Sequence, residues 1–226
     1  MRNKIRLCII HRYRILCEAL TQTLNQCDDF MVIPADSEKA DVLEFIGKHR
    51  LDMVIFDPFQ SKREGLDVIR TICQGNSGIR PVVFISEPHW QYAFRLLRAG
   101  AMGCLTESTN SQELIEAIRH VDTGKVYLPP RMQELFAERF VHLEAPCPDD
   151  TLSDREFQVM RLLALGKTCS EISKSLFIGT KTVDSHRANL LRKLSLRNNA
   201  DIARFAMQKG YIVSTGYESC RQVSQV

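Results

Sequence analysis

The sequence predicts an α/β domain built on a five-stranded parallel sheet with helices on both faces, followed by a small all-α domain of four helices. Short apolar runs alternate with helical patterns five times over residues 5–123, which is the order of a parallel sheet covered on both faces. Residues 144–150 then hold two prolines and three acidic residues, a composition typical of an interdomain connector. Four more helical patterns follow over residues 151–213. A chain of 226 residues is long enough for two such domains.

The strands of the first domain are expected at the short apolar runs 5–10, 31–35, 52–56, 81–86 and 103–106. Its helices are expected where apolar residues recur every three or four positions, at 15–24, 40–49, 65–73, 90–99 and 111–123. Ser111 is expected to cap the last of these helices. Parallel sheets bind their ligands at the carboxyl ends of the strands. The polar residues expected at those ends are His11, Arg12, Asp57, Ser86 and Glu107.

The second domain begins with a capping box, Ser153-Asp-Arg-Glu156, and its first helix ends at Gly166. A short helix at 170–177, a tight turn at Ile178-Gly179 and a long helix capped by Thr180 are expected next. The last helix is expected from 199 or 200 to 209, ended by Gly210. A short helix, a turn with glycine and a longer helix indicate a helix-turn-helix unit. The expected core consists of Leu163, Ile172, Leu176, Ile178, Val183, Leu190, Leu194 and Ile202.

The long helix, residues 180–194, divides into two faces at 3.6 residues per turn. One face is apolar and holds Val183, Leu190, Leu191 and Leu194. The opposite face is basic and polar and holds Lys181, Ser185, Ala188 and Arg192, flanked by Asp184 and Asn189. Cations suit phosphate, and short polar or methyl groups suit base edges in the major groove of DNA. An ordinary solvated amphipathic helix is the alternative for this helix taken alone.

The charge distribution favours an anionic partner for the second domain. Residues 1–145 hold 18 Lys+Arg against 19 Asp+Glu, a net charge of −1, whereas residues 151–212 hold 11 against 5, a net charge of +6. The eight cysteines are scattered without a CxxC pair, so reduced, buried thiols are expected rather than a zinc site or disulfides. The N-terminal apolar run is too short for a membrane span or signal peptide, so a cytoplasmic protein without a membrane partner is expected.

The phrases Leu51-Asp-Met-Val-Ile-Phe-Asp57, with Gly65-Leu66 after it, and Arg98-Ala-Gly-Ala-Met-Gly103 resemble parts of the receiver domain of two-component response regulators. The resemblance covers residues 4 to about 130. It implies a flavodoxin-like receiver fold with Asp57 at the position of the phosphoacceptor.

The strand-end residues depart from the pattern of that family. Its receivers carry an acidic pair that binds Mg²⁺ where this chain has His11 and Arg12, and a lysine where it has Glu107; Ser86 is retained. Mg²⁺ prefers carboxylate oxygens, and without metal and lysine the charge on a transferring phosphoryl group is uncompensated. The sequence therefore predicts no Mg²⁺ cofactor and a vestigial phosphoacceptor, Asp57. Two positions for Arg12 stay open, one paired with Asp57 and one in solvent.

The second domain resembles the LuxR-type domain of the NarL/FixJ response regulators through Leu152-Ser-Asp-Arg-Glu, the segment 181–194 and Gly210-Tyr-Ile. The resemblance implies that Lys181 and Thr182 meet phosphates at a helix N-terminus, and that Asp184, Ser185 and Ala188 face base edges. The further residues implied to reach the DNA backbone or flanking bases are Arg187, Asn189, Arg192 and Lys193. Alternatively, Arg192 forms an internal salt bridge with Glu156 instead of contacting DNA. The implied homodimer contact is the last helix, with Ala200, Ala203, Phe205 and Ala206.

These observations divide the chain into a receiver-like domain (1–130), a helical extension and linker (131–150), a helix-turn-helix domain (151–213) and a C-terminal tail (214–226). The leading hypothesis is a non-enzymatic transcription regulator that binds double-stranded DNA as a dimer, independently of phosphorylation. An adaptor that binds another regulator through its receiver is the alternative, and another regulator or a small ligand is a possible receiver partner. An enzyme is disfavoured, because the strand ends offer no nucleophile–base pair and no Gly-rich phosphate loop.

Overall fold

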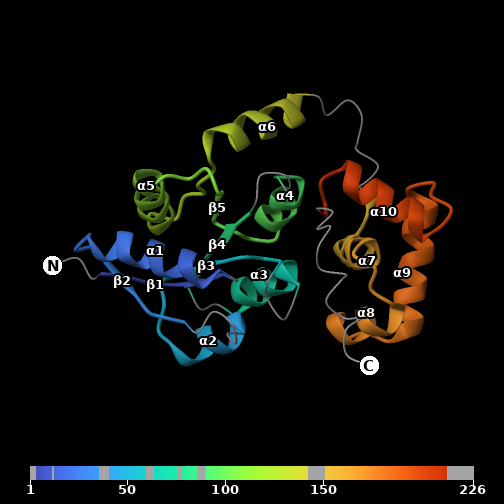
Figure 1. Ribbon diagram of the computed structural model, residues 1–226, viewed down its shortest axis with the longest axis horizontal. Coiled ribbons are helices and arrows are strands. Elements are labelled where there is room, and N and C mark those ends of the chain that lie inside the picture. Colours follow the sequence, from blue (N-terminus) through green and yellow to red (C-terminus); the bar gives the residue numbers. More distant parts are fainter. Residues whose placement is uncertain are drawn as a thin grey trace. The chain divides into compact units, whose positions relative to one another are not determined.

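The structure, a computed structural model, describes residues 4–11, 13–35, 41–59, 64–75, 78–85, 90–141 and 151–212 (Figure 1). Side chains at 90 and 139–141 lie outside this description, as do the predicted connector at 144–150 and the tail at 214–226. The chain divides into two units between residues 146 and 147, and each unit is described by itself.

The first unit is built on a five-stranded parallel sheet with the strand order β2-β1-β3-β4-β5. The strands are β1 (Ile5–Ile10), β2 (Phe30–Val32), β3 (Met53–Phe56), β4 (Arg80–Phe84) and β5 (Gly103–Leu105). β1, β3 and β4 are rich in buried apolar residues, as expected for strands covered on both faces. The predicted fold class of this unit is confirmed.

Helices cover both faces of this sheet (Figure 1). They are α1 (Arg14–Asn25), α2 (Val42–Lys48), α3 (Gly65–Gln74), α4 (Trp90–Arg98) and α5 (Ser111–Asp122). α1 packs beside α5 on one face, while α2, α3 and α4 follow one another on the other face. The core on the α1–α5 side joins alternate strand residues such as Leu7, Ile9 and Ile55 to Leu114 and Ile118 of α5.

Two local predictions in this unit are wrong. The predicted strand at 31–35 is shorter and begins earlier, because β2 is an edge strand whose pairing with β1 ends near Ile33, and Pro34 has no N–H to continue it. The cap of α5 is Asn110 rather than Ser111. The Asn110 side chain accepts from the Glu113 N–H at 2.9 Å, and the Glu113 carboxylate accepts from the Asn110 N–H at 3.0 Å.

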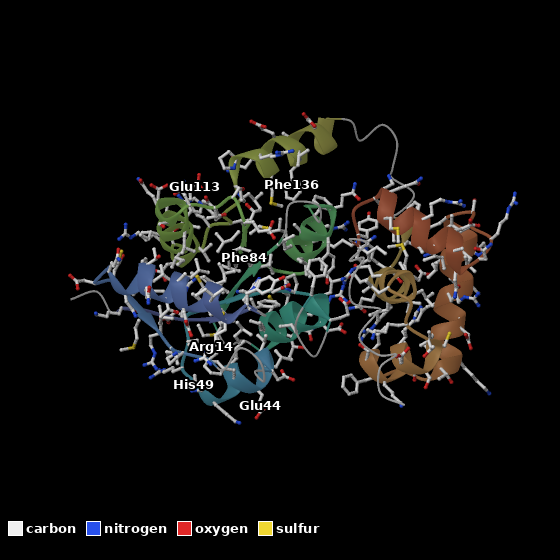
Figure 2. All side chains as sticks on the ribbon, in the orientation of Figure 1. Arg14, Glu44, His49, Phe84, Glu113 and Phe136 are labelled. Atoms are coloured by element: carbon white, nitrogen blue, oxygen red, sulfur yellow. The ribbon has the colours of Figure 1, made fainter. Side chains whose placement is uncertain are left out.

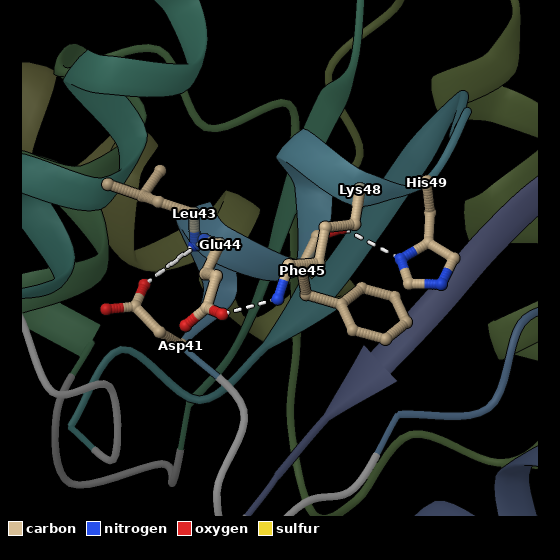
Figure 3. A network of polar contacts seen from close by, with 6 residues as sticks. All are labelled: Asp41, Leu43, Glu44, Phe45, Lys48 and His49. Atoms are coloured by element: carbon tan, nitrogen blue, oxygen red, sulfur yellow. Dashed lines mark hydrogen bonds and ion pairs between the residues drawn. The ribbon is translucent and has the colours of Figure 1, made fainter.

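α2 is a short helix held at both ends by local polar contacts (Figure 3). The Asp41 carboxylate caps its start by accepting from the Leu43 N–H at 3.0 Å. Lys48 and Glu44 form an ion pair one turn apart at 2.5 Å. At its end the His49 ring stacks on Phe45, with ring centroids 4.1 Å apart, and its Nδ1 lies 2.9 Å from the Phe45 carbonyl oxygen. These contacts offset the low intrinsic stability of a seven-residue helix.

The predicted helical extension forms α6 (Pro130–Val141) and packs on the first unit. Figure 2 shows Phe136 on α6, and its ring lies edge-on to that of Phe94 in α4, with centroids 5.3 Å apart. Met132, one turn earlier on α6, is buried. The extension therefore begins as a helix docked on the receiver-like unit rather than as a free tether.

The second unit contains α7 (Asp154–Ala164), α8 (Cys169–Leu176), α9 (Thr180–Lys193) and α10 (Asn199–Gln208). The predicted capping box at Ser153 and Glu156 is present. Gly166 ends α7 in the left-handed region, with φ of +80°. Thr180 is the first helical residue of α9 rather than its cap, because the extended residue before the helix is Gly179. Of the predicted core residues all are buried except Ile178, which is half-buried.

A buried polar contact joins the two ends of this unit. Arg161 of α7 donates from Nε to the Tyr211 carbonyl oxygen at 3.3 Å, and the Tyr211 ring packs edge-on against Phe157 with centroids 4.8 Å apart. Both aromatic side chains are fully buried. α7 is thus the central helix, and it packs against both α9 and α10.

The six cysteines among the described residues are free thiols. Cys8 and Cys104 are buried, and burial raises the pKa of each thiol to about 12. Cys73 is exposed and the other three, Cys17, Cys27 and Cys169, are half-buried, so burial is less general than predicted. None of the helices in the described ranges has the length and apolar character that a membrane span requires.

Gly65→Ala is expected to destabilise the first unit. A Cβ atom at position 65 would lie 2.5 Å from the Pro58 Cβ and 2.9 Å from the Pro58 carbonyl oxygen, so the loop after β3 would have to move. Such overpacking costs about 1–3 kcal/mol of unfolding free energy. Urea unfolding followed by circular dichroism measures this loss. Gly47→Ala in α2 is the matched control, because nothing lies within 4 Å of its Cβ position, and it is expected to be neutral or stabilising. Equal stability of the two variants would contradict the prediction.

Candidate functional site

α9 presents an exposed polar face, as its residue pattern predicts. Val183 and Leu190 are buried, while most of the predicted contact residues are exposed. The exposed residues are Lys181, Thr182, Asp184, Ser185, Ala188, Asn189 and Arg192. Arg187 and Lys193 are half-buried. The face therefore combines cations, short hydrogen-bonding side chains and a methyl group along one helix.

The start of α9 leaves backbone N–H groups available. The Thr182 and Val183 amides donate to the Gly179 carbonyl at 3.0 and 3.1 Å, so the amides before them have no intrahelical acceptor. These amides and the helix dipole favour an anion beside Lys181. The Ser185 hydroxyl, one turn on, donates back to the Lys181 carbonyl at 3.0 Å, which leaves its lone pairs as outward acceptors.

Two side chains of the exposed face are held by neighbouring helices. Arg187 donates from Nε to Asn199 Oδ1 at the start of α10, at 2.7 Å. The Asp184 carboxylate accepts from the Cys169 thiol of α8, at 3.4 Å. Both contacts cross between helices, and neither follows from the spacing of residues along α9. The partners Asn199 and Cys169 were not among the predicted site residues, because a one-dimensional pattern does not say which neighbouring helix end approaches a given turn.

Lys193 makes an internal contact. Its Nζ donates to Glu156 Oε2 at 2.7 Å and to the Thr151 carbonyl oxygen at 3.0 Å. The internal salt bridge predicted for Glu156 therefore forms with Lys193 rather than with Arg192, which is exposed. The Glu156 side chain is 5% exposed and that of Lys193 is 29% exposed, so the carboxylate of this pair is shielded from water. Lys193 joins the last turn of α9 to the first turn of α7.

The Glu156 carboxylate is the hub of this contact. It also accepts from the Ser153 N–H at 2.8 Å as part of the capping box. Burial by itself would raise the pKa of Glu156, but the hydrogen bonds from Lys193 and Ser153 outweigh burial and hold the pKa below its ordinary value of 4.5. Glu156 is therefore charged at neutral pH.

The carboxyl ends of β1 and β3 bring His11 and Asp57 together in the first unit. The Asp57 N–H donates to the Ile10 carbonyl at 3.1 Å, which continues the β1–β3 ladder by one residue. His11 Nε2 lies 3.7 Å from Asp57 Oδ2, and the two side chains are 8% and 7% exposed. The other carboxylate oxygen, Oδ1, accepts from the Phe59 N–H at 2.8 Å. Both oxygens of Asp57 are thus contacted from within the domain.

The orientation of the His11 ring is fixed from several sides. Its Nδ1 accepts from the Tyr13 N–H at 3.1 Å, so the proton of the neutral ring is on Nε2, the nitrogen that faces Asp57. The ring also packs edge-on against Phe84 at the end of β4, with centroids 5.2 Å apart. His11 is therefore held beside Asp57.

The remaining predicted pocket residues are placed differently. Arg12 and Ser86 lie outside the described residues, so the two positions considered for Arg12 stay predictions. Glu107 is exposed in the turn after β5. The buried residue at that strand end is Thr106, whose hydroxyl lies 2.8 Å from that of Ser108.

These residues do not fit a Mg²⁺ site. Mg²⁺ requires several hard oxygen ligands, and here one carboxylate faces an imidazole whose Nε2 carries the proton. In the part of the chain that the structure describes, no group of three His, Cys, Asp or Glu side chains could hold a metal ion.

A separate surface cavity of about 570 Å³ lies between α1 and the β1–β2 edge. Its lining includes Ile9, Cys17 and Val32, with the Arg14–Glu18 ion pair at its rim. His11 and Asp57 are not among its lining residues. Its volume suits a small molecule, but it is distinct from the strand-end pair.

A polar contact that was not predicted from the sequence holds α4 near the carboxyl end of β3. The Tyr92 hydroxyl donates to Glu64 Oε2 at 2.9 Å, and both side chains are buried. The Phe59 ring, which follows Asp57 by two residues, lies 5.2 Å from the Tyr92 ring. α4 is therefore anchored to the segment between β3 and α3.

Two protein families match this chain. The response regulator receiver domain matches residues 7–119, which is half of the chain, and the bacterial regulatory proteins of the luxR family match residues 150–206. The oxygen regulatory protein NreC of Staphylococcus carnosus (strain TM300) is 25% identical over 212 residues, covering 91% of this chain and 98% of NreC. The transcriptional regulatory protein DesR of Bacillus subtilis (strain 168) is 29% identical over 199 residues, covering 88% of this chain and 94% of DesR.

Solved structures share the fold of the chain. RcsB from Salmonella enterica serovar Typhimurium, bound to promoter P1flhDC in the presence of phosphomimetic BeF3-, superimposes with a TM-score of 0.72 at 19% identity. The match covers 91% of this chain and 100% of that chain. At this identity the likeness concerns the fold.

Lys193→Met is expected to destabilise the second unit by about 2 kcal/mol, because it leaves the buried Glu156 carboxylate without its charged partner. Urea unfolding of the full chain, followed by circular dichroism, measures the loss. Arg192→Met is the matched control, since it removes an exposed cation from the same turn, and it is expected to change stability by less than about 0.5 kcal/mol.

The pH dependence gives a second check on this pair. Because the pKa of Glu156 is lowered in the folded state, its contribution is present above about pH 4.5 and is lost as the pH falls through the folded-state value. The stability difference between the wild type and Lys193→Met should therefore shrink below pH 4.5. A difference that does not change between pH 7 and the acid range would contradict the assigned role.

Proposed function

This chain belongs to the response regulators in which a receiver domain precedes a LuxR-family regulatory domain, and we propose that it regulates transcription as a homodimer without phosphorylation of Asp57. A DNA-binding transcription regulator is the function that this family membership carries. Three parts of the proposal go beyond family membership. They are the residues that contact DNA, the homodimer, and the independence from phosphorylation.

The exposed face of α9 is the observation that supports the DNA contact. Lys181 stands beside unpaired backbone amides at the helix start, a combination that suits a phosphate. Ser185 and Ala188, on the next turn, offer a hydroxyl and a methyl group of the size that suits base edges. Arg192 supplies a second exposed cation. Lys193 is assigned instead to holding α9 on α7, because its ammonium group already binds Glu156 and Thr151.

The contacts of Asp57 support independence from phosphorylation. A phosphoacceptor carboxylate needs one oxygen free for attack and a metal ion beside it to neutralise the incoming phosphoryl group. Here Oδ1 accepts from the Phe59 amide and Oδ2 faces His11, and the neighbourhood does not fit Mg²⁺. Glu107, in place of a lysine, would add repulsion rather than compensation. Asp57 is in this proposal a structural partner of His11.

The outer side of α10 is proposed as the contact between DNA-binding domains. Ala200 is exposed, Ala203 and Phe205 are half-buried, and Met207 is 47% exposed, so a partly apolar strip is available. Ala206 is buried with Ile202, so it belongs to the core and is removed from the predicted contact. Two copies joined here would present two α9 helices to half-sites related by a twofold axis.

The receiver domain takes a different input in this proposal. Because Asp57 is engaged by His11, the input signal in this proposal is the binding of a partner protein or a small ligand to the receiver. We assign the protein no catalytic activity and no metal cofactor. Because the proposed partner is chromosomal DNA, we assign the protein to the cytoplasm.

Lys181→Ala and Arg192→Ala are expected to weaken binding to every DNA sequence alike, because each removes one phosphate contact. Each should flatten the slope of log K against log salt by about 1. Fluorescence anisotropy with a duplex selected from a random pool measures the affinity and the salt slope. The selected duplex should contain two half-sites related by a twofold axis. Lys125→Ala, an exposed cation of the first unit, is the control and should leave both unchanged. Loss of sequence preference with an unchanged salt slope would rule out the phosphate role.

Incubation with acetyl phosphate and Mg²⁺ is expected to give no phosphorylated protein, because Asp57 lacks the metal site and the lysine. A Phos-tag gel measures this, with an active receiver protein in a parallel lane as the positive control. Asp57→Asn should accordingly leave DNA affinity within about twofold of the wild type. A shifted band that Asp57→Ala abolishes would refute this part of the proposal.

A further inference from the structure

Asp184 occupies an unusual electrostatic position on the exposed face of α9. Cations stand on the turns before and after it, Lys181 and Arg187, yet its carboxylate is held by a neutral group. The Cys169 thiol donates to Asp184 Oδ1 at 3.4 Å. Arg187, which could have paired with Asp184, donates from Nε to Asn199 instead. The contact joins the first turn of α8 to the second turn of α9, the two helices of the helix-turn-helix unit.

The Cys169 thiol is protonated at neutral pH and can therefore act as a donor. Burial raises the pKa of Cys169, and the hydrogen bond to Asp184 and its negative charge raise it further. A neutral donor orients the carboxylate without neutralising it. The position of Asp184 is thus set from α8 by a donor that carries no charge.

A carboxylate held in this way has few suitable partners on duplex DNA. It repels phosphates, so a contact with the DNA backbone is unfavourable. In the major groove it can accept from the amino group of cytosine, which is the pairing typical of Asp and Glu. Oδ2 and the remaining lone pair of Oδ1 are available for that amino group, since the thiol uses one acceptor position of Oδ1.

We propose that Cys169 is a positioning residue for DNA specificity: its thiol holds the Asp184 carboxylate of α9 so that the carboxylate accepts from the amino group of one cytosine in each half-site. The inference rests on the proposed function, DNA binding by α9. It adds a residue of α8 that does not itself touch DNA, and it gives Asp184 a defined chemical target.

The test measures discrimination at single base pairs rather than total affinity. A site is first selected from a random duplex pool with the wild-type full chain, and each C·G pair in one half-site is then exchanged for T·A. Asp184→Ala is expected to abolish discrimination at one such pair, which in the wild type is about 5- to 100-fold. Cys169→Ala is expected to reduce discrimination at that same pair by about threefold or more, and Cys169→Ser, which keeps a donor, to preserve most of it.

Two controls separate positioning from a general structural effect. Ser170→Ala alters the next, exposed residue of α8 and should leave discrimination unchanged. In the Asp184→Ala background, Cys169→Ala should have no further effect on discrimination, because the group that it positions is gone. Thermal unfolding of each variant is measured alongside.

A change in the DNA tests the same contact, and its effect on wild-type binding does not depend on the folding of any variant. Replacing the identified cytosine by 2-pyrimidinone, which lacks the amino group, should weaken wild-type binding, but by no more than the T·A exchange, because thymine also turns its O4 acceptor towards the carboxylate. It should leave Asp184→Ala binding unchanged.

Each other outcome is informative. Discrimination that depends on Asp184 but survives Cys169→Ala would overturn the role of Cys169. If the wild type binds DNA sequence-selectively but Asp184→Ala changes discrimination at no C·G pair, the whole inference is overturned and the proposed function stands. Absence of sequence-selective DNA binding by the wild type would overturn both.

Discussion

Burial of one stripe of α9 is the constraint on which the functional surface depends. Val183, Leu190 and Leu194 are withdrawn from water, and α9 packs against α7. Once that stripe is buried, helix periodicity requires Lys181, Ser185 and Arg192 to face outward. The Lys193–Glu156 pair adds a polar contact at the end of the same interface. The outward face is thus a consequence of how the inward face packs.

Pairing between β1 and β3 plays the corresponding part in the receiver. The register that sets Ile10 beside Phe56 brings the next residue of each strand, His11 and Asp57, to the same edge. In a receiver with acids after β1, this geometry would gather carboxylates for a metal ion. Here the same backbone brings an imidazole to Asp57. One backbone arrangement therefore supports a different chemistry when the strand-end residues change.

The two units use their buried polar groups differently. In the second unit the buried Glu156 and Arg161 join elements that are distant in sequence, Glu156 through the half-buried Lys193 and Arg161 through the Tyr211 carbonyl oxygen. In the first unit the buried contact of Tyr92 with Glu64 fixes α4, and α4 in turn carries α6 through Phe94 and Phe136. The helix that leads towards the linker is therefore seated on an element anchored beside the strand-end pair.

The sequence by itself determined the order of elements in both units, because apolar periodicity reports which side of a helix or strand is buried. It also determined the capping box at Ser153 and the outward face of α9, since both depend on residues close together in the chain. Tertiary structure decided what depends on approach between distant residues. The partner of Glu156 is Lys193 rather than Arg192, the cap of α5 is Asn110 rather than Ser111, and the thiol of Cys169 reaches Asp184. Neighbouring positions on a helix offer similar side chains, and only the packed backbone sets which of them comes within hydrogen-bonding distance.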